Sequence, residues 1–198
     1  MFEQAYNIRN FAAVLITTLL LSACATQSSS VNDDLDPLTG VTVTYSDSPV
    51  VLYRDNPSYA AYSRNFVHLG PIEINKSGSY RYYLWLGIWS TLQASDLAHQ
   101  RDGYASVVLV VDGEPLLLDL AGWTPAAIGT STPVYPKPYA TSLDAYYRVT
   151  ADQIRLIAQA RELQLRTTGT YPLEFQMWDQ QKAAKRDLIK FVRSVNNY

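Results

Sequence analysis

The chain has 198 residues, a formal net charge of −2 and only 17% charged residues. This near-neutral balance excludes the basic patch and high isoelectric point by which a nucleic-acid-binding protein is usually recognised. Because 47% of the residues are hydrophobic and 15 are tyrosines, we expect a folded chain and not a disordered one. The single cysteine, Cys24, excludes an internal disulfide and a zinc site built on cysteine pairs.

An apolar run at residues 11–21 leads directly into the four residues 21–24, Leu-Ser-Ala-Cys. The run has the length of a signal peptide and is too short to cross a bilayer of about 30 Å as a helix. Residues 21–24 resemble the lipobox of bacterial lipoproteins, in which a leucine and two small residues precede an invariant cysteine. The resemblance implies that residues 1–23 are a signal peptide and that Cys24 carries a diacylglyceryl thioether and an N-acyl chain. The alternative is an uncleaved signal anchor or a core helix with a buried cysteine.

The lipobox resemblance also predicts where the protein resides. One acyl chain gives only marginal membrane binding, whereas two or three chains on Cys24 would hold the protein on a membrane. In Gram-negative lipoproteins an aspartate after the cysteine favours retention in the inner membrane, and this chain has Ala25 there. The resemblance therefore favours a lipid-anchored protein of the outer membrane that faces the periplasm, with no cofactor other than its lipid.

A polar segment follows the cysteine and is poor in large apolar side chains. We expect residues 24–36 to be a lipidated N-terminus and flexible tether, and residues 37–198 to be a single β-rich globular domain. The segment contains Asp33, Asp34 and Asp36. These aspartates lack the ligand spacing, glycine and closing glutamate of an EF-hand loop, so a solvated acidic linker is the favoured interpretation.

From residue 37 on, short apolar segments alternate with turn residues. Residues 41–45 and 50–53 alternate or cluster apolar side chains as strands do. Residues 58–65 are compatible with a helical turn or an edge strand, and residues 66–74 are extended but interrupted by a Gly-Pro pair. Residues 80–89 carry large apolar or aromatic side chains almost throughout, which predicts a central strand covered on both faces.

The clearest local signal is Asp112-Gly113, which lies between apolar residues 106–111 and 114–120. Asp-Gly favours the positive φ angles of a type I′ turn, so a two-residue hairpin is predicted. Pro115 has no N–H donor, and its strand should therefore start late or lie at an edge. Residues 121–139 form a proline-rich loop that is either a recognition surface or a stiff crossover between sheets.

The last third of the chain changes to helical patterns. Thr150 and Gln153 have the spacing of a capping box, which predicts a helix to about residue 162. A hairpin is expected around Thr168-Gly169, and Asp179 is expected to cap a second amphipathic helix. These elements predict an α+β fold, mainly antiparallel β as a sandwich or half-open barrel, with two helices near the C-terminus.

Residues for catalysis or metal binding are not indicated by any recognisable motif, and we expect a protein that is not an enzyme. His68 and His99 are isolated, so each is interpreted as a hydrogen-bonded or solvated side chain. Glu114 and Asp119 lie near Asp112 in the predicted hairpin. A carboxylate pair of this kind leaves an enzyme acting on cell-wall glycan or peptide as the alternative function.

Aromatic side chains give the stronger functional hypothesis. One face of the strand predicted at residues 80–89 is aromatic, and the proline-rich loop adds two tyrosines. Such rings can stack on sugars or hold a peptide, although burial of both strand faces in the core is the competing interpretation. The hypothesis is a non-enzymatic binding or assembly subunit of the envelope, with an envelope protein or peptidoglycan as partner. Its candidate ligand- or partner-binding residues are Tyr83, Trp85, Trp89, Tyr135 and Tyr139.

Overall fold

The computed structural model describes residues 30–57, 62–91, 101–179 and 181–195. In this part of the chain the strands are β1 (Val31–Asp36), β2 (Val41–Ser46), β3 (Val50–Asp55), β4 (Arg64–Lys76), β5 (Ser79–Ser90), β6 (Ser106–Val111), β7 (Glu114–Gly122), β8 (Leu143–Val149), β9 (Leu163–Thr167) and β10 (Glu174–Met177). The helices are α3 (Ala151–Gln159) and α4 (Lys182–Val195), with short 3₁₀ turns η2 (Arg101–Tyr104) and η3 (Pro125–Ala127). Cys24, His99 and residues 24–29 of the predicted tether lie outside the described residues.

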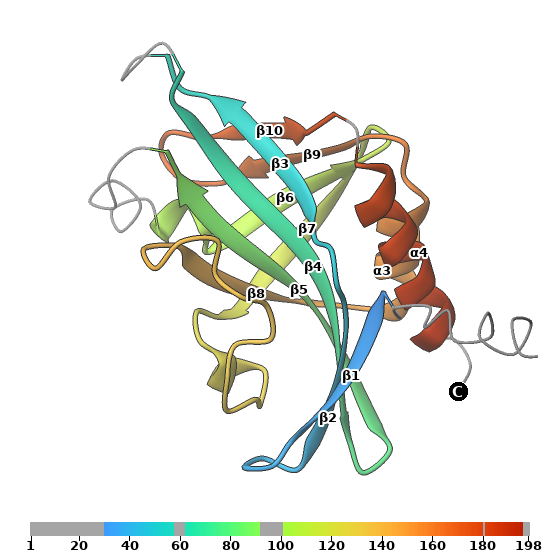
Figure 1. The fold of residues 1–198 in the computed structure, drawn as a ribbon. Coiled ribbons are helices and arrows are strands. Elements are labelled where there is room, and N and C mark those ends of the chain that lie inside the picture. Colours follow the sequence, from blue (N-terminus) through green and yellow to red (C-terminus); the bar gives the residue numbers. More distant parts are fainter. Residues whose placement is uncertain (1–29, 58–61, 92–100, 180, 196–198) are drawn as a thin grey trace, which may run out of the picture.

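Eight of the strands pair into a closed antiparallel ring, in the order β4-β3-β10-β9-β6-β7-β8-β5, because β5 pairs back onto β4 (Figure 1). Side chains can fill the interior of a ring of this size, and one hydrophobic cluster does so here, with Leu52, Leu84 and Leu109 fully buried. The predicted α+β class, mainly antiparallel and with two helices towards the C-terminus, is confirmed. Of the two predicted arrangements, the strand pairing is that of a barrel.

Strands β1 and β2 extend beyond the ring, because the long strand β4 changes partner along its length. Residues 64–69 of β4 pair with β3, and residues 72–75 pair with β2. β1 then pairs with β2 over all six of its residues, from Val31↔Ser46 to Asp36↔Val41. The β1–β2 pair lies at the lower end of the ring in Figure 1.

The prediction that the tether reaches residue 36 is wrong for its last six residues, since they form β1. Their aspartates are bonded across the strand pair: the Thr44 hydroxyl lies 2.5 Å from Asp33 Oδ1, and the Tyr45 hydroxyl donates to Asp34 over 2.9 Å. Asp36 accepts hydrogen bonds from the backbone and hydroxyl of Ser131, and these hold the pKa of its carboxyl well below the usual range. Asp33 and Asp34 therefore help to hold β1 against β2, and Asp36 holds the loop that contains Ser131.

The predicted central strand at residues 80–89 lies within β5 and is paired on both sides, with β4 and β8. Leu84, Leu86 and Ile88 face the barrel interior. On the other face, Tyr83 and Trp85 are covered by residues 121–139, which cross the outside of the barrel. Burial of both faces is confirmed for residues 83–88, whereas Arg81 is exposed and Tyr80, Tyr82 and Trp89 are half-buried.

The hairpin turn predicted from Asp112-Gly113 is present in the structure. Asp112 and Gly113 have φ angles of 48° and 93°, as a type I′ turn requires. Pro115 pairs only with β6, because β7 meets β8 from Leu120 on, so this proline does lie on a locally free edge. The β9–β10 hairpin also forms as expected. Of residues 58–65, the first four are outside the described residues and Arg64 begins β4.

The two helices pack together against one end of the barrel (Figure 1). The capping box of α3 is present: Thr150 Oγ1 accepts from the Gln153 N–H, and Gln153 Oε1 accepts from the Thr150 N–H. Helix α3 ends at Gln159, earlier than expected, and α4 begins three residues after Asp179. Within the described residues, neither helix is long and apolar enough to span a membrane.

Candidate functional site

Aromatic rings gather on the outer face of β4 and β5. The antiparallel register places Phe66 opposite Trp89, and Gly70 opposite Trp85. Because alternate residues of a strand point to the same face, these side chains form one row along the outside of the barrel. The row divides into a part covered by residues 121–135 and a more open part towards the start of β4.

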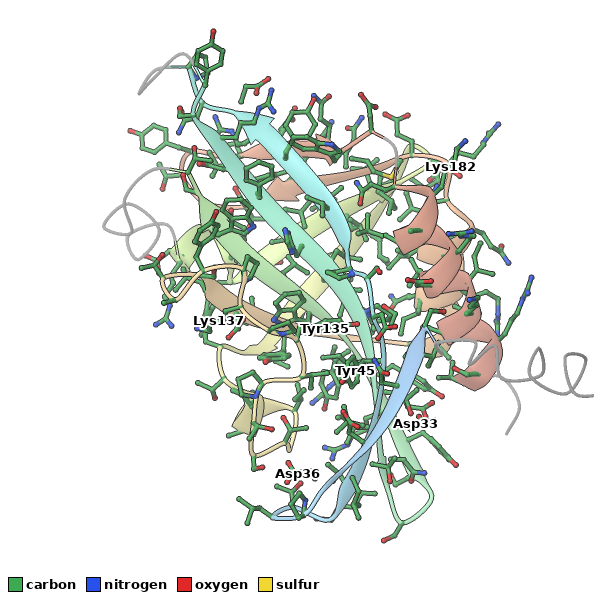
Figure 2. All side chains as sticks on the ribbon, in the orientation of Figure 1. Asp33, Asp36, Tyr45, Tyr135, Lys137 and Lys182 are labelled. Atoms are coloured by element: carbon green, nitrogen blue, oxygen red, sulfur yellow. The ribbon has the colours of Figure 1, made fainter. Side chains whose placement is uncertain are left out.

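The covered part contains three of the five predicted site residues. Tyr83, Trp85 and Tyr135 are only 1–2% exposed. The Tyr135 ring stacks on Trp85 with 4.7 Å between centroids and lies directly over Gly70, where a Cβ atom would be 2.5 Å from the ring. Figure 2 shows Tyr135 next to Tyr45 on this face. These three side chains are core residues and cannot contact a ligand in this structure.

Polar contacts fasten the proline-rich loop over this core. The Tyr135 hydroxyl donates to the Pro71 carbonyl over 2.9 Å and accepts from the Ser46 N–H over 3.2 Å. The Trp85 indole N–H donates to Asp144, whose second oxygen lies 3.3 Å from Lys137 Nζ. Of the two interpretations of residues 121–139, these contacts favour the stiff crossover for the segment around Tyr135.

The open part forms a continuous run of rings that we call the aromatic band: Tyr139, Trp89, Phe66, Trp178 and Tyr53. Neighbouring centroids are 4.8 Å, 4.2 Å, 5.6 Å and 5.0 Å apart in that order. Tyr139 is 58% exposed and Trp178 is 36% exposed. Trp89 and Tyr139 were predicted, and the structure brings them into contact.

The other three members of the band were missed from sequence. Tyr53 and Phe66 face each other across β3 and β4, so their signal appears only when the strand register is known. Trp178 follows β10, which is joined to β3 by just two paired residues. No local pattern predicts that a tryptophan more than 120 positions away stacks near Tyr53.

A neutral histidine orients the central tryptophan of the band. The Trp89 indole N–H donates to His68 Nε2 over 3.1 Å. Burial lowers the pKa of His68, which keeps the ring in the neutral form that has a nitrogen acceptor. The hydrogen-bonded interpretation of His68 is therefore confirmed.

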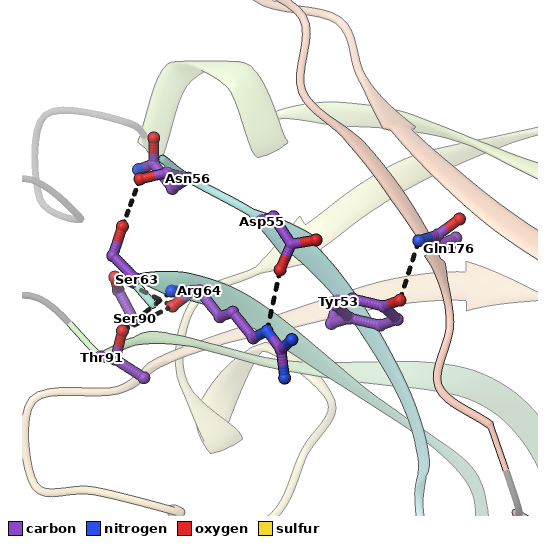
Figure 3. A network of polar contacts seen from close by, with 8 residues as sticks. All are labelled: Tyr53, Asp55, Asn56, Ser63, Arg64, Ser90, Thr91 and Gln176. Carbon is purple, nitrogen blue, oxygen red and sulfur yellow. Dashed lines mark hydrogen bonds and ion pairs between the residues drawn. The ribbon is translucent and has the colours of Figure 1, made fainter. Parts of the chain in front are cut away.

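Charged and amide groups border the band at Tyr53 (Figure 3). The Arg64 guanidinium carbon lies 5.4 Å from the Tyr53 centroid and 5.2 Å from that of Trp178, and its Nε donates to Asp55 over 2.8 Å. Gln176 donates to the Tyr53 hydroxyl over 2.9 Å. Arg64 is thus held over two rings by one carboxylate.

Two hollows share Tyr53 in their linings. The first, of about 340 Å³, is lined by Tyr53, Arg64, Trp178 and Asp179. The second, of about 500 Å³, is lined by Tyr53, Arg54, Asp55, Gln164, Pro172, Glu174, Phe175 and Gln176. Both volumes fall in the usual range for small-ligand sites, about 300–1,000 Å³.

The carboxylates that suggested hydrolysis do not come together. Glu114 and Asp119 are both exposed and lie five residues apart on β7, which corresponds to about 17 Å along a strand, with the side chains on opposite faces. Glycosidases need separations of at most about 9.5 Å. Asp112 accepts from the Arg161 and Glu162 N–H groups, which lower its pKa and explain its place in the turn.

Comparison of the chain with protein-family models, curated proteins and solved structures gives no match. Among the described residues, no group of three or more histidine, cysteine or acidic side chains is arranged to hold a metal ion. The aromatic band with its two hollows is therefore the candidate functional site, argued from its geometry alone.

Proposed function

We propose that this chain is a lipoprotein of the Gram-negative outer membrane that acts as a non-enzymatic binding or assembly subunit facing the periplasm. In this proposal Cys24 carries the lipid, and the aromatic band is the surface that binds a partner. The observation that carries the proposal is the continuity of the band, in which five rings touch in sequence while Tyr139 and Trp178 remain exposed.

Partial exposure of large rings is a meaningful feature of a folded domain. Adjoining exposed apolar surface is characteristic of binding sites, and Tyr and Trp combine apolar area with a hydrogen-bonding group. Here the rings are already ordered by stacking and by the His68 and Gln176 hydrogen bonds. Binding would therefore cost little side-chain entropy, which favours affinity.

The anchoring half of the proposal is supported by the lipobox resemblance of residues 21–24. A Cys24→Ala variant is expected to leave the membrane fraction, because the acyl chains would be lost. A Ser22→Ala variant, which keeps a small residue before the cysteine, is the control and should remain with the membranes. A Cys24→Ala protein that still pellets with membranes would contradict lipid anchoring.

The binding half can be tested by photo-crosslinking in living cells. A photoreactive phenylalanine analogue is placed at Tyr139 or Trp178, the two most exposed members of the band, and at Leu117 as control. Leu117 is 59% exposed on β7 and belongs to neither hollow. A product formed at both band positions and absent at Leu117 supports binding through the band. Identical products at all three positions, or none at the band, would refute it.

A further inference from the structure

We propose that the hollow between Tyr53 and Trp178 binds a neutral sugar ring, as part of an oligosaccharide that continues past Tyr53. This inference rests on the proposed function, because it assigns a ligand class to one end of the aromatic band. It depends on the ring geometry, the placement of Arg64 and the charges of the hollow, which are taken in turn below.

The first step is the shape of the hollow. The Tyr53 and Trp178 rings are 5.0 Å apart at their centroids and inclined by 63°, so they form two walls of a corner. Phe66 also contacts Trp178, with 5.6 Å between the ring centroids. A pyranose ring has apolar C–H faces and a polar rim, and an aromatic wall can cover such a face while leaving the rim free.

The second step concerns the side chains of the hollow that can form hydrogen bonds with a ligand. Arg64 Nε donates to Asp55, and the guanidinium carbon lies 5.4 Å and 5.2 Å from the Tyr53 and Trp178 centroids. No further hydrogen bond of its two terminal nitrogens is seen in the described part of the chain, so they can donate to sugar oxygens. Asp179 lines the same hollow and can accept from sugar hydroxyls. Donor and acceptor thus face the rim of a stacked ring.

Charge then selects among ligand classes. The lining of the hollow has one positive side chain, Arg64, and one negative side chain, Asp179. The charge of Arg64 is already paired with Asp55, which lies outside this lining, so Asp179 would disfavour an anionic ligand. A cationic ligand would be repelled by the Arg64 guanidinium, which borders both rings. A neutral polyhydroxylated ring satisfies both donors and acceptors without a charge penalty.

The second hollow extends the site beyond one ring. It shares Tyr53 with the first hollow and is also lined by Gln164 and Gln176, which carry side-chain amides. Because Gln176 also fixes the Tyr53 hydroxyl, the wall shared by the two hollows is held in place. Two adjoining hollows predict that an oligosaccharide binds more tightly than a single sugar.

Saturation-transfer NMR on the full lipidated chain in detergent tests this inference. The probes are glucose, three neutral tetrasaccharides (cellotetraose, maltotetraose and the N-acetylglucosamine tetramer) and the anionic tetragalacturonate. At least one neutral tetrasaccharide should receive saturation and bind at least tenfold more tightly than glucose. Trp178→Ala and Arg64→Met should each weaken binding at least tenfold.

Arg101→Met is the matched control, because Arg101 also lies over a tryptophan, 4.9 Å from the Trp123 centroid, but lines neither hollow. It should bind as the wild type does. Arg64→Met keeps the aromatic walls and tests the site even if Trp178→Ala fails to fold. The inference is overturned if no neutral tetrasaccharide binds, if Arg64→Met binds normally, or if tetragalacturonate binds best. A protein crosslinked at Trp178 with no sugar binding would overturn this inference while leaving the proposed function intact.

Discussion

Two buried tyrosines, one in the crossover loop and one in β8, provide a matched test of what holds that loop in place. Tyr135 and Tyr146 belong to the same hydrophobic cluster and are 2% and 0% exposed. The Tyr135 hydroxyl bonds to Ser46 and Pro71, whereas the Tyr146 hydroxyl has no hydrogen-bond partner in the described structure. Changing each tyrosine to phenylalanine removes a buried hydroxyl, which is hydrogen-bonded at Tyr135 and without a partner at Tyr146.

The expected free energies follow from this difference. Tyr135→Phe leaves the Ser46 N–H and the Pro71 carbonyl without this partner, and a buried unpaired polar group costs about 1–3 kcal/mol. We therefore expect a loss of about 2–4 kcal/mol in unfolding free energy. Tyr146→Phe removes a buried hydroxyl that is already unpaired, so it should be neutral or stabilising by up to about 1 kcal/mol.

Urea unfolding followed by tryptophan fluorescence measures both variants against the wild type. Thermal unfolding gives a second measure: in a domain of this size each kcal/mol of unfolding free energy shifts the melting temperature by about 2–4 °C. The melting temperature of Tyr135→Phe should therefore be roughly 4–16 °C lower than that of the wild type. Unchanged m-values would show that the variants alter stability and not compactness. Equal destabilisation by the two substitutions would refute the reasoning, because it would mean that the hydroxyl contacts do not distinguish the two sites.

Three further substitutions have expected outcomes. Burial raises the pKa of Glu73, and one of its carboxylate oxygens has no hydrogen-bond partner in the described structure. The contribution of Glu73 to stability is therefore complete below about pH 4.3 and is lost as the pH rises. Glu73→Gln should be about 1 kcal/mol more stable at pH 7, and its free energy of urea unfolding should depend less on pH. Gly70→Ala should cost about 1–3 kcal/mol in the same assay, since its Cβ would meet the Tyr135 ring, and a neutral result would contradict the close approach. The pKa of His68 is lowered, so its contribution to stability depends on pH in the opposite direction: it is complete above about pH 6.5 and is lost on acidification. Trp89 fluorescence should therefore change with pH in the acid range in the wild type. It should not change in His68→Gln, because the amide oxygen of glutamine can still accept the indole hydrogen bond.

The elements that were predictable from sequence are those specified by neighbouring residues. The Asp112-Gly113 turn and the Thr150–Gln153 capping box each depend on residues a few positions apart, and both are present. Strand β1 shows the opposite case. Its sequence, VNDDLD, has no apolar alternation, and Asp33 and Asp34 are hydrogen-bonded by Thr44 and Tyr45 of the next strand. A polar strand that depends on cross-strand partners has no signal of its own.

The same distinction explains the outcome for the candidate site. Trp85 and Trp89 have the same place in the alternating pattern of β5, and only tertiary structure separates them. Trp85 is covered because Gly70 leaves room for the Tyr135 ring. Trp89 faces Phe66 instead and remains in the open part of the row. Which aromatic residue is buried was therefore decided by a loop some fifty positions away.

The corrected start of the fold also constrains the proposed anchoring. Because β1 begins at Val31, only the seven residues 24–30 separate the proposed lipid from the first strand, and they can span at most about 25 Å. The first residue of β1, Val31, pairs with Ser46, and the neighbouring Tyr45 pairs with Ile72, so the tether joins the fold level with the middle of β4. The aromatic band lies nearer the start of β4, around Phe66, which is about five residues or about 17 Å of strand away. Tether and strand together separate the band from the proposed lipid by roughly 40 Å at most along the strand direction, so the proposed anchoring keeps the binding surface close to the membrane.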